Sequence, residues 1–182
     1  MRKLRYYVAC SVDGFIAHTD GTIEGLGGRE TDFDFVATLQ AFDVVLMGRK
    51  TYELSRRLGH STNPNKANYV FSRTMKESPD QNVTIVSEQA IELVRALKQE
   101  TGKAIWLCGG AELATTLLAE HLLDEIILKV NPILFGSGIP LFSREVEQTE
   151  LELIESKTYR NSYLVLHYRV KHGTPSDATT AT

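Results

Sequence analysis

The stretch Ala104-Ile105-Trp106-Leu107-Cys108-Gly109-Gly110-Ala111 decides the fold, because in it a short apolar run ends in two glycines that open a helical pattern. Glycines lack the Cβ that would hold a ligand away from the backbone, and a helix start offers unpaired N–H groups and a positive dipole end. The backbone of Gly109, Gly110 and Ala111 is therefore expected to bind a phosphate. Strand-Gly-Gly-helix turns also serve simple packing, so this corner alone does not establish a ligand.

A second corner repeats the pattern and adds charge. The apolar run 43–47 ends at Gly48, and a helical pattern starts with Arg49, Lys50 and Thr51. Gly48 allows a close approach, Arg49 can donate two hydrogen bonds to one phosphate, and Thr51 can donate from its hydroxyl and its backbone N–H. Together with Lys50, these residues predict a second anion site.

A third strand-like run ends in Ser72 and Arg73, a hydroxyl and a guanidinium. Because ligands bind at the carboxyl ends of strands in open α/β sheets, the three corners predict one elongated polyanion. A dinucleotide with a further ribose phosphate fits, and the cations favour NADPH over NADH, which lacks that phosphate. The Rossmann fingerprint is missing, since neither Gly-x-Gly element, at 25–27 and 136–138, opens a βαβ unit. We therefore expect a different fold to hold the cofactor.

Composition narrows the class of protein. The 182 residues suit one domain, which we place at residues 1–171, and residues 172–182 are expected to form a disordered tail. The net charge of −3 disfavours a nucleic-acid binder, and no apolar stretch approaches the roughly 20 residues of a membrane span. Finding no targeting segment, we expect a cytoplasmic protein in which Cys10 and Cys108 are buried free thiols. The five histidines show no ligand spacing, so no metal site is predicted.

The pattern of apolar residues predicts the fold class. Six short runs rich in β-branched and aromatic residues, separated in several places by helical patterns, are typical of a largely parallel sheet covered on both faces. Two later runs alternate in character around the turn-prone residues 160–162, so they predict an antiparallel hairpin. The expected fold is α/β with three layers: an eight-stranded mixed, mostly parallel sheet flanked by helices, with a C-terminal antiparallel hairpin. The predicted strands cover residues 5–10, 43–47, 68–72, 83–86, 104–108, 125–130, 151–157 and 163–170.

In their order and spacing, these motifs resemble the dihydrofolate reductase superfamily across residues 4–170. The residues that carry the resemblance are Ser11-Val12-Asp13-Gly14-Phe15-Ile16-Ala17, Met47-Gly48-Arg49-Lys50-Thr51-Tyr52, Phe71-Ser72-Arg73, Trp106-Leu107-Cys108-Gly109-Gly110-Ala111-Glu112-Leu113 and Pro132 to Phe142. The first and fourth of these are most similar to the riboflavin-biosynthesis reductase family, the C-terminal domain of a bifunctional deaminase-reductase.

The resemblance implies a dihydrofolate-reductase-like fold and a role for each motif. Ala9 and Ile16 would line the nicotinamide of NADPH, through backbone groups and an apolar wall. The residues implied to hold the adenosine phosphate are Arg49, Thr51, Ser72 and Arg73, and those implied to bind the pyrophosphate are Gly109, Gly110 and Ala111. The family commonly pairs its subunits, so the resemblance also implies a homodimer.

The reaction also needs a proton. Reduction of an imine-like carbon leaves a neighbouring nitrogen to be protonated, and a carboxyl group in a partly dry pocket can relay that proton. Counted back from Met47-Gly48, Asp32 falls where dihydrofolate reductases keep their substrate-facing acid, so the resemblance implies that Asp32 is catalytic. Asp34 is the rival, two residues on and pointing to another helix face. A solvated acid at a helix start also explains either residue.

The expected function is that of an NADPH-dependent reductase of a pyrimidine- or pterin-type heterocycle, resembling 5-amino-6-(5-phosphoribosylamino)uracil reductase. A true dihydrofolate reductase is the first alternative, but Lys66 and Lys129 stand where folate reductases use arginine and threonine. A non-catalytic NADP(H)-binding protein is the second alternative. The expected partners are a small heterocyclic substrate and a second copy of the chain, without nucleic acid or membrane.

Overall fold

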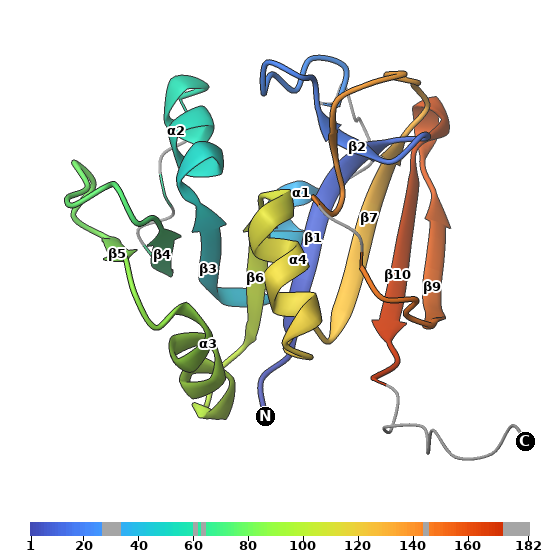
Figure 1. Cartoon of the computed structure of the whole chain (residues 1–182). Helices are drawn as coiled ribbons and strands as arrows, with labels where there is room; N and C mark the ends of the chain where they lie inside the picture. Colours follow the sequence, from blue (N-terminus) through green and yellow to red (C-terminus); the bar gives the residue numbers. More distant parts are fainter. Residues whose placement is uncertain (27–33, 60–61, 63–64, 144–145, 173–182) are drawn as a thin grey trace, which may run out of the picture.

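The main sheet of the protein has eight strands. The computed structural model describes residues 1–26, 34–59, 62, 65–143 and 146–172. In spatial order the strands are β5 (Val83–Val86), β4 (Ala67–Phe71), β3 (Phe42–Gly48), β6 (Ala104–Gly109), β1 (Leu4–Ser11), β7 (Glu125–Asn131), β10 (Leu164–Val170) and β9 (Leu151–Thr158) (Figure 1). The first six are parallel, and β10 is antiparallel to both β7 and β9. The predicted mixed sheet and its C-terminal hairpin are confirmed.

A second sheet was not predicted. It pairs β2 (Phe15–Ala17) with β8 (Ile139–Pro140) in an antiparallel manner, above the carboxyl ends of the central strands in Figure 1. Both strands are too short to leave a periodic pattern in the sequence. The close approach of the two segments requires glycine at one point, since a Cβ on Gly138 would lie 2.3 Å from the carbonyl oxygen of Ala17.

Helices cover both faces of the main sheet. On one face, α3 (Ala90–Gln99) and α4 (Ala111–Ala119) bury Val94, Leu97 and Leu117 against Leu46 and Leu107. Figure 1 shows α4 in front of the sheet on this side. We call it the α4 face. Among the helices of the described ranges, none combines the length and apolar character needed to cross a membrane.

The opposite side of the sheet carries α1 (Phe35–Leu39) and α2 (Arg49–Arg57). Tyr52 of α2 packs with Val45 and Met47, the neighbours of Leu46 whose side chains point the other way along β3. The ring of Phe35 in α1 lies against Trp106, whose indole N–H donates to the carbonyl of Tyr7 at 2.9 Å. This side is called the α1 face below.

Candidate active site

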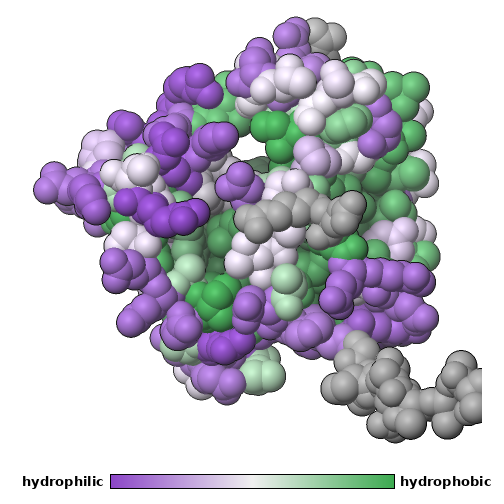
Figure 2. Space-filling view, in the orientation of Figure 1, coloured by the Kyte–Doolittle hydropathy of each residue, from purple (hydrophilic) through white to green (hydrophobic). Residues whose placement is uncertain are grey.

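The three predicted corners meet at one edge of the sheet. β3 lies between β4 and β6, and Gly48 is the partner of Phe71 in β4, while Met47 is the partner of Gly109 in β6. The residues that follow these strands, including Ser72, therefore lie next to one another along the upper edge in Figure 1. In the space-filling view this edge is hollowed between α2 and the β2 segment (Figure 2).

The two glycine corners are in contact. A Cβ on Gly48 would lie 3.6 Å from the backbone nitrogen of Gly110 and 3.9 Å from the carbonyl oxygen of Gly109. A Cβ on Gly110 would lie 3.4 Å from the hydroxyl of Thr51. Gly109 has φ of +135°, which side-chain-bearing residues rarely adopt. Four residues from two separate motifs thus form one backbone-lined corner.

This corner holds two helix starts. Gly48 and Gly110 are the N-caps of α2 and α4, and neither provides a side-chain cap, so no cap oxygen competes for the N–H groups of the first turns. Ala111, the first residue of α4, is buried, whereas Glu112 is exposed. Two positive dipole ends side by side suit a ligand with more than one phosphate.

The cations beside this corner differ in their surroundings. The Arg49 guanidinium donates to the carboxylate of Glu53, one turn along α2, at 2.8 Å. Lys50 and Arg73 are exposed. The hydroxyl of Ser72 accepts the backbone N–H of Met75 at 2.9 Å, and so holds the turn that carries Arg73.

The predicted nicotinamide end is built around the loop after β1. Ala9 of β1 and Ile16 of β2 are both half-buried. The hydroxyl of Ser11 accepts the N–H of Phe15 at 3.0 Å, and Asp13 accepts the N–H of Gly136 at 2.7 Å. The first contact closes the loop on itself, and the second ties it to the segment before β8.

The Asp13 carboxylate is stabilised in its charged form. A hydrogen bond from the Ser11 hydroxyl and the N–H groups of Gly136 and Phe135 lower the pKa of Asp13, although partial desolvation opposes them. Asp13 therefore holds the loop as an anion at neutral pH. The ring of His18 stacks on Phe135 with centroids 3.9 Å apart and extends the same contact.

Of the two candidate acids, the structure describes Asp34 and not Asp32. Asp32 lies outside the residues that the structure describes. Asp34, expected to point from a helix face, is instead the N-cap of α1, and its carboxylate accepts the N–H of Ala37 at 2.8 Å. The helix begins after Asp34, which gives this aspartate a backbone partner, so its position is that of the acid at a helix start that the sequence analysis gave as an alternative.

Comparison with known proteins then identifies the family. A family model described as the RibD C-terminal domain matches residues 2–165. The chain belongs to the RibD C-terminal domain family. YwjB of Bacillus subtilis (strain 168) is 38% identical over 170 residues, which make up 92% of this chain and 97% of YwjB.

Solved structures agree with this family. A protein of Shewanella sp. PV-4, named for riboflavin biosynthesis, has a TM-score of 0.81 and 27% identity, with 94% of this chain and 100% of that chain covered. The diaminohydroxyphosphoribosylaminopyrimidine deaminase/5-amino-6-(5-phosphoribosylamino)uracil reductase of Thermotoga maritima shares the fold, with a TM-score of 0.71 at 17% identity over 93% of this chain and 57% of that chain. The resemblance to the riboflavin reductase branch is confirmed.

Two departures from folate reductases can be placed in this RibD C-terminal domain. The Lys66 ammonium donates to the carbonyls of Leu39, at 2.7 Å, and Phe42, so it ties α1 to the start of β3. Lys129 is buried in β7 on the α1 face, beside Ala9. Sequence reasoning assigned no role to Lys129, because only the strand register brings it next to the predicted nicotinamide residue.

The two cysteines are free thiols in this domain. Cys10 is buried as expected, whereas Cys108 is half-buried. Burial raises the pKa of Cys10 to about 11 and that of Cys108 to about 12, so both thiols are neutral near pH 7. Neutral thiols are poor nucleophiles, which favours packing as their role.

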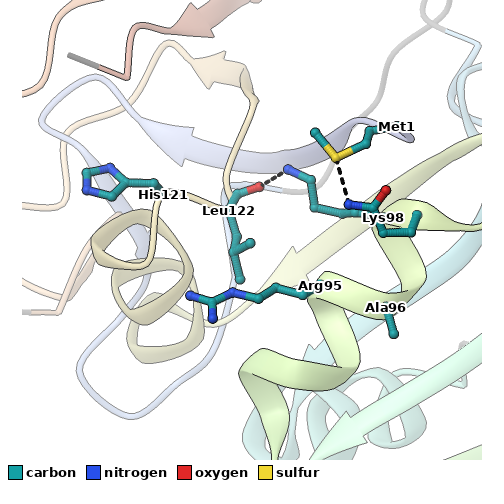
Figure 3. Close-up of a pocket in the computed structure, with 7 residues that line it drawn as sticks. Met1, Arg95, Ala96, Lys98, His121 and Leu122 are labelled. Atoms are coloured by element: carbon teal, nitrogen blue, oxygen red, sulfur yellow. Dashed lines mark hydrogen bonds between the residues drawn. The ribbon is translucent and has the colours of Figure 1, made fainter. Parts of the chain in front are cut away.

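A separate cavity of about 360 Å³ lies far from the glycine corners. It is lined by Met1, by the carboxyl half of α3 with Arg95 and Lys98, and by His121 and Leu122 just after α4, at the opposite edge of the sheet (Figure 3). Its two cations already have partners, since Lys98 donates to the Leu122 carbonyl at 2.6 Å and Arg95 pairs with Glu120. This cavity is not the candidate site.

Proposed function

We propose that the chain is an NADPH-dependent reductase of a pyrimidine- or pterin-type heterocycle. The observation that carries the proposal is the contact between the corners at Gly48 and Gly110, which joins two helix starts and the Arg49 and Arg73 segments at one edge. Membership of the RibD C-terminal domain family supports oxidoreductase chemistry. The T. maritima relative, named as a 5-amino-6-(5-phosphoribosylamino)uracil reductase, supports the substrate class.

The residues of the corner fit a dinucleotide. Bare backbone at Gly48 and Gly110 lets the two corners lie against each other with their N–H groups uncovered by side chains, and Thr51 adds a hydroxyl beside them. We assign the pyrophosphate to Gly109, Gly110 and Ala111. The residues assigned to the adenosine phosphate are Arg49, Lys50, Thr51, Ser72 and Arg73.

The bound cofactor would supply a hydride; the chain supplies position and a proton. Ala9 and Ile16 would flank the nicotinamide, held by the Ser11 and Asp13 contacts that fix the loop between them. Asp32 is assigned to hold the proton for the substrate nitrogen. The carboxylate of its rival, Asp34, already accepts a backbone N–H as the N-cap of α1, which favours Asp32 for this role.

The test is a titration followed by an activity assay. Trp106, the only tryptophan, lies on β6 three residues before Gly109, so its fluorescence should be quenched when NADPH binds. Loss of nicotinamide absorbance is then followed with 5-amino-6-(5-phosphoribosylamino)uracil and with a panel of pyrimidines and pterins. A failure to bind NADPH would refute the proposal.

The two alternatives give different results in these assays. A dihydrofolate reductase is disfavoured, because the Lys66 ammonium already donates to two backbone carbonyls and is not available to a folate carboxylate. Oxidation of NADPH with dihydrofolate, and with no other compound of the panel, would instead support this alternative. A non-catalytic NADP(H)-binding protein would bind NADPH, oxidise it with no compound of the panel, and be unaffected by Asp32→Asn.

We also propose a homodimer formed through the C-terminal hairpin. β9 is an edge strand whose residues are all exposed, and Leu151, Leu153 and Ile154 are exposed to 42%, 52% and 41%. Figure 2 shows hydrophobic residues gathered on the right, the side where Figure 1 places this hairpin. Exposed apolar patches of this kind mark protein interfaces.

A further inference from the structure

The segment between β4 and β5, residues 72–82, carries one of the cations assigned to the adenosine phosphate. The structure describes all of its residues, and they form neither a helix nor a strand. Arg73, near the start of this segment, is exposed. The hydrogen bonds of a regular element therefore do not fix where Arg73 lies relative to Arg49, at the start of α2. If both cations bind one phosphate, another contact must hold the segment against α2.

Tyr52 of α2 provides this contact. Its side chain is buried, and its hydroxyl donates to the carboxylate of Asp80 and lies 2.7 Å from the hydroxyl of Ser78. Because the single phenolic proton goes to Asp80, Ser78 is the donor in the second hydrogen bond, and it accepts the N–H of Asp80 at 3.0 Å. The Arg56 guanidinium, one turn further along α2, lies 3.4 Å from the same carboxylate. Two residues of α2 thus bind the far part of the segment.

The near part of the segment is held as well. The hydroxyl of Ser72 accepts the backbone N–H of Met75 at 2.9 Å, which closes a turn around Arg73. The side chain of Met75 packs against the apolar cluster that contains Tyr52. Arg73 therefore lies on a short stretch of chain whose position depends on the ring of Tyr52 at one point and on its hydroxyl at another.

The hydroxyl of Tyr52 is a stable donor. Burial and the hydrogen bond to the Asp80 carboxylate raise the pKa of Tyr52, so the hydroxyl keeps its proton at neutral pH. A buried hydroxyl needs a partner in any protein, and Tyr6 shows a purely structural solution, a hydrogen bond to the carbonyl of Leu141 at 3.2 Å. The hydroxyl of Tyr52 binds instead to side chains of the segment that carries Arg73, and so joins the two halves of the candidate phosphate site.

We propose that Tyr52 is a positioning residue: its hydroxyl bond to Asp80 holds Arg73 within reach of the phosphate that Arg49 binds, and so sets the preference for NADPH over NADH. The inference rests on the proposed function and assigns a new residue to cofactor selection. Tyr52 is buried and acts through the segment, not by touching the cofactor. A cation that is held in place before binding loses less conformational freedom when it pairs with the phosphate, so affinity is higher.

The experiment measures the affinities for NADPH and NADH by calorimetry, because Trp106 packs against the same cluster as Tyr52 and its fluorescence could change in the variants. Tyr52→Phe keeps the ring and removes the hydroxyl. Ser78→Ala removes one of the two partners of that hydroxyl. Neither substitution changes the charge of the site. Tyr6→Phe is the matched control, because it also removes the hydrogen bond of a buried tyrosine, far from α2.

Tyr52→Phe should weaken the binding of NADPH by about fivefold and that of NADH by less than about twofold. Ser78→Ala should lower the NADPH preference in the same direction, by about twofold to threefold. Tyr6→Phe should leave the ratio of the two affinities unchanged, even where urea denaturation shows that it lowers the free energy of unfolding. In an Arg73→Ala background, Tyr52→Phe should have no further effect on the ratio, because the cation that it positions is gone.

Two results would overturn the inference: a Tyr52→Phe protein that keeps the wild-type ratio of affinities, or a change in that ratio that persists without Arg73. Should Tyr52→Phe fail to fold, Ser78→Ala is judged by the same two criteria. A wild type that binds no NADPH, or binds NADPH and NADH equally, counts against the proposed function and removes the inference with it. A wild type that prefers NADPH, with variants that keep the preference, counts only against the role of Tyr52.

Discussion

Cofactor discrimination depends on the guanidinium groups of Arg49 and Arg73. Each can donate charge-assisted hydrogen bonds to a ribose phosphate, which NADH lacks. Arg49→Ala and Arg73→Ala should each weaken the binding of NADPH by about 10- to 100-fold, and the binding of NADH by less than about threefold. Binding is measured by Trp106 quenching.

Arg57→Ala is the control for these two variants, since Arg57 is an exposed cation at the far end of the same helix. Equal losses for NADPH and NADH would contradict the assignment. The Arg49 guanidinium already pairs with the Glu53 carboxylate. The loss of NADPH affinity in Arg49→Ala therefore measures the difference between binding the phosphate and binding Glu53.

Gly48→Ala separates folding from ligand binding. Gly48 has φ of −75° and ψ of 159°, which alanine adopts freely, and its Cβ would make ordinary contacts at 3.6 and 3.9 Å. The free energy of unfolding should change by less than about 1 kcal/mol. NADPH binding should weaken by about tenfold or more, because the methyl group would lie 3.6 Å from the Gly110 nitrogen that we assign to the pyrophosphate.

In denaturation experiments, Gly109→Ala should differ from Gly48→Ala, because it should lower the free energy of unfolding. Its φ of +135° should cost a side-chain-bearing residue about 1–3 kcal/mol of stability, whether or not a ligand binds. If Gly48→Ala binds NADPH like the wild type, the backbone corner is not the cofactor site.

Among the elements, β7 predicts a pH dependence of stability, because its first residue, Glu125, is a buried carboxylate. Burial acts to raise the pKa of Glu125, but the hydrogen bond from His167 and the charge of Arg5 outweigh it, so the pKa lies below the ordinary value of 4.5. As the pH falls, Glu125 of the unfolded chain therefore takes up its proton before Glu125 of the folded protein does. The stabilisation is complete above about pH 4.5 and is lost as the pH falls through the lowered pKa.

Glu125→Gln should lower the free energy of unfolding by about 3 kcal/mol near pH 7, because Arg5 keeps its charge without a partner. The difference from the wild type should shrink in acid, where the wild-type carboxylate is protonated. Urea denaturation across this pH range measures both effects. Glu155→Gln, which breaks the exposed pair with Lys157, should change stability by less than about 1 kcal/mol and is the control. A constant difference down to low pH would contradict the linkage.

The elements that the sequence predicted are those that leave a long pattern. β1 extends one residue beyond its prediction at each end and β7 one residue at its carboxyl end, because apolar runs define the buried middle of a strand better than its ends. β2 and β8 were missed, since three and two residues carry no period. Glycine corners were visible in the sequence because backbone exposure needs that residue type.

The neighbours of the predicted nicotinamide residues could not be predicted in the same way. Lys129 and Asn131 become neighbours of Ala9 and Ser11 only through the pairing of strands more than a hundred residues apart. Likewise, the sequence left Asp34 open between a catalytic acid and an acid at a helix start, and the start of α1 shows that it caps the helix. Local patterns fix elements, whereas a substrate pocket depends on register between them.

At the scale of the whole molecule, the cofactor corner and the proposed dimer surface lie on different parts of the sheet. Strand order puts β3, β4 and β6 on one side of β1 and the hairpin β9–β10 at the far edge. Binding of NADPH and pairing of subunits should therefore be separable by mutation. Covering β9 would also protect an open sheet edge, which otherwise invites aggregation.

Leu153→Lys tests this separation. In a twofold interface each substitution occurs twice, so one lysine places two charges in an apolar contact. The wild type should have twice the chain mass of 20.3 kDa by light scattering, and the variant should have the mass of one chain. Leu58→Lys, a comparably exposed leucine at the end of α2, should stay dimeric. Because β9 lies at the far edge from the glycine corners, monomeric Leu153→Lys should still quench Trp106 with NADPH. A wild-type monomer would refute the dimer, and loss of NADPH binding on dissociation would mean that the partner subunit completes the site.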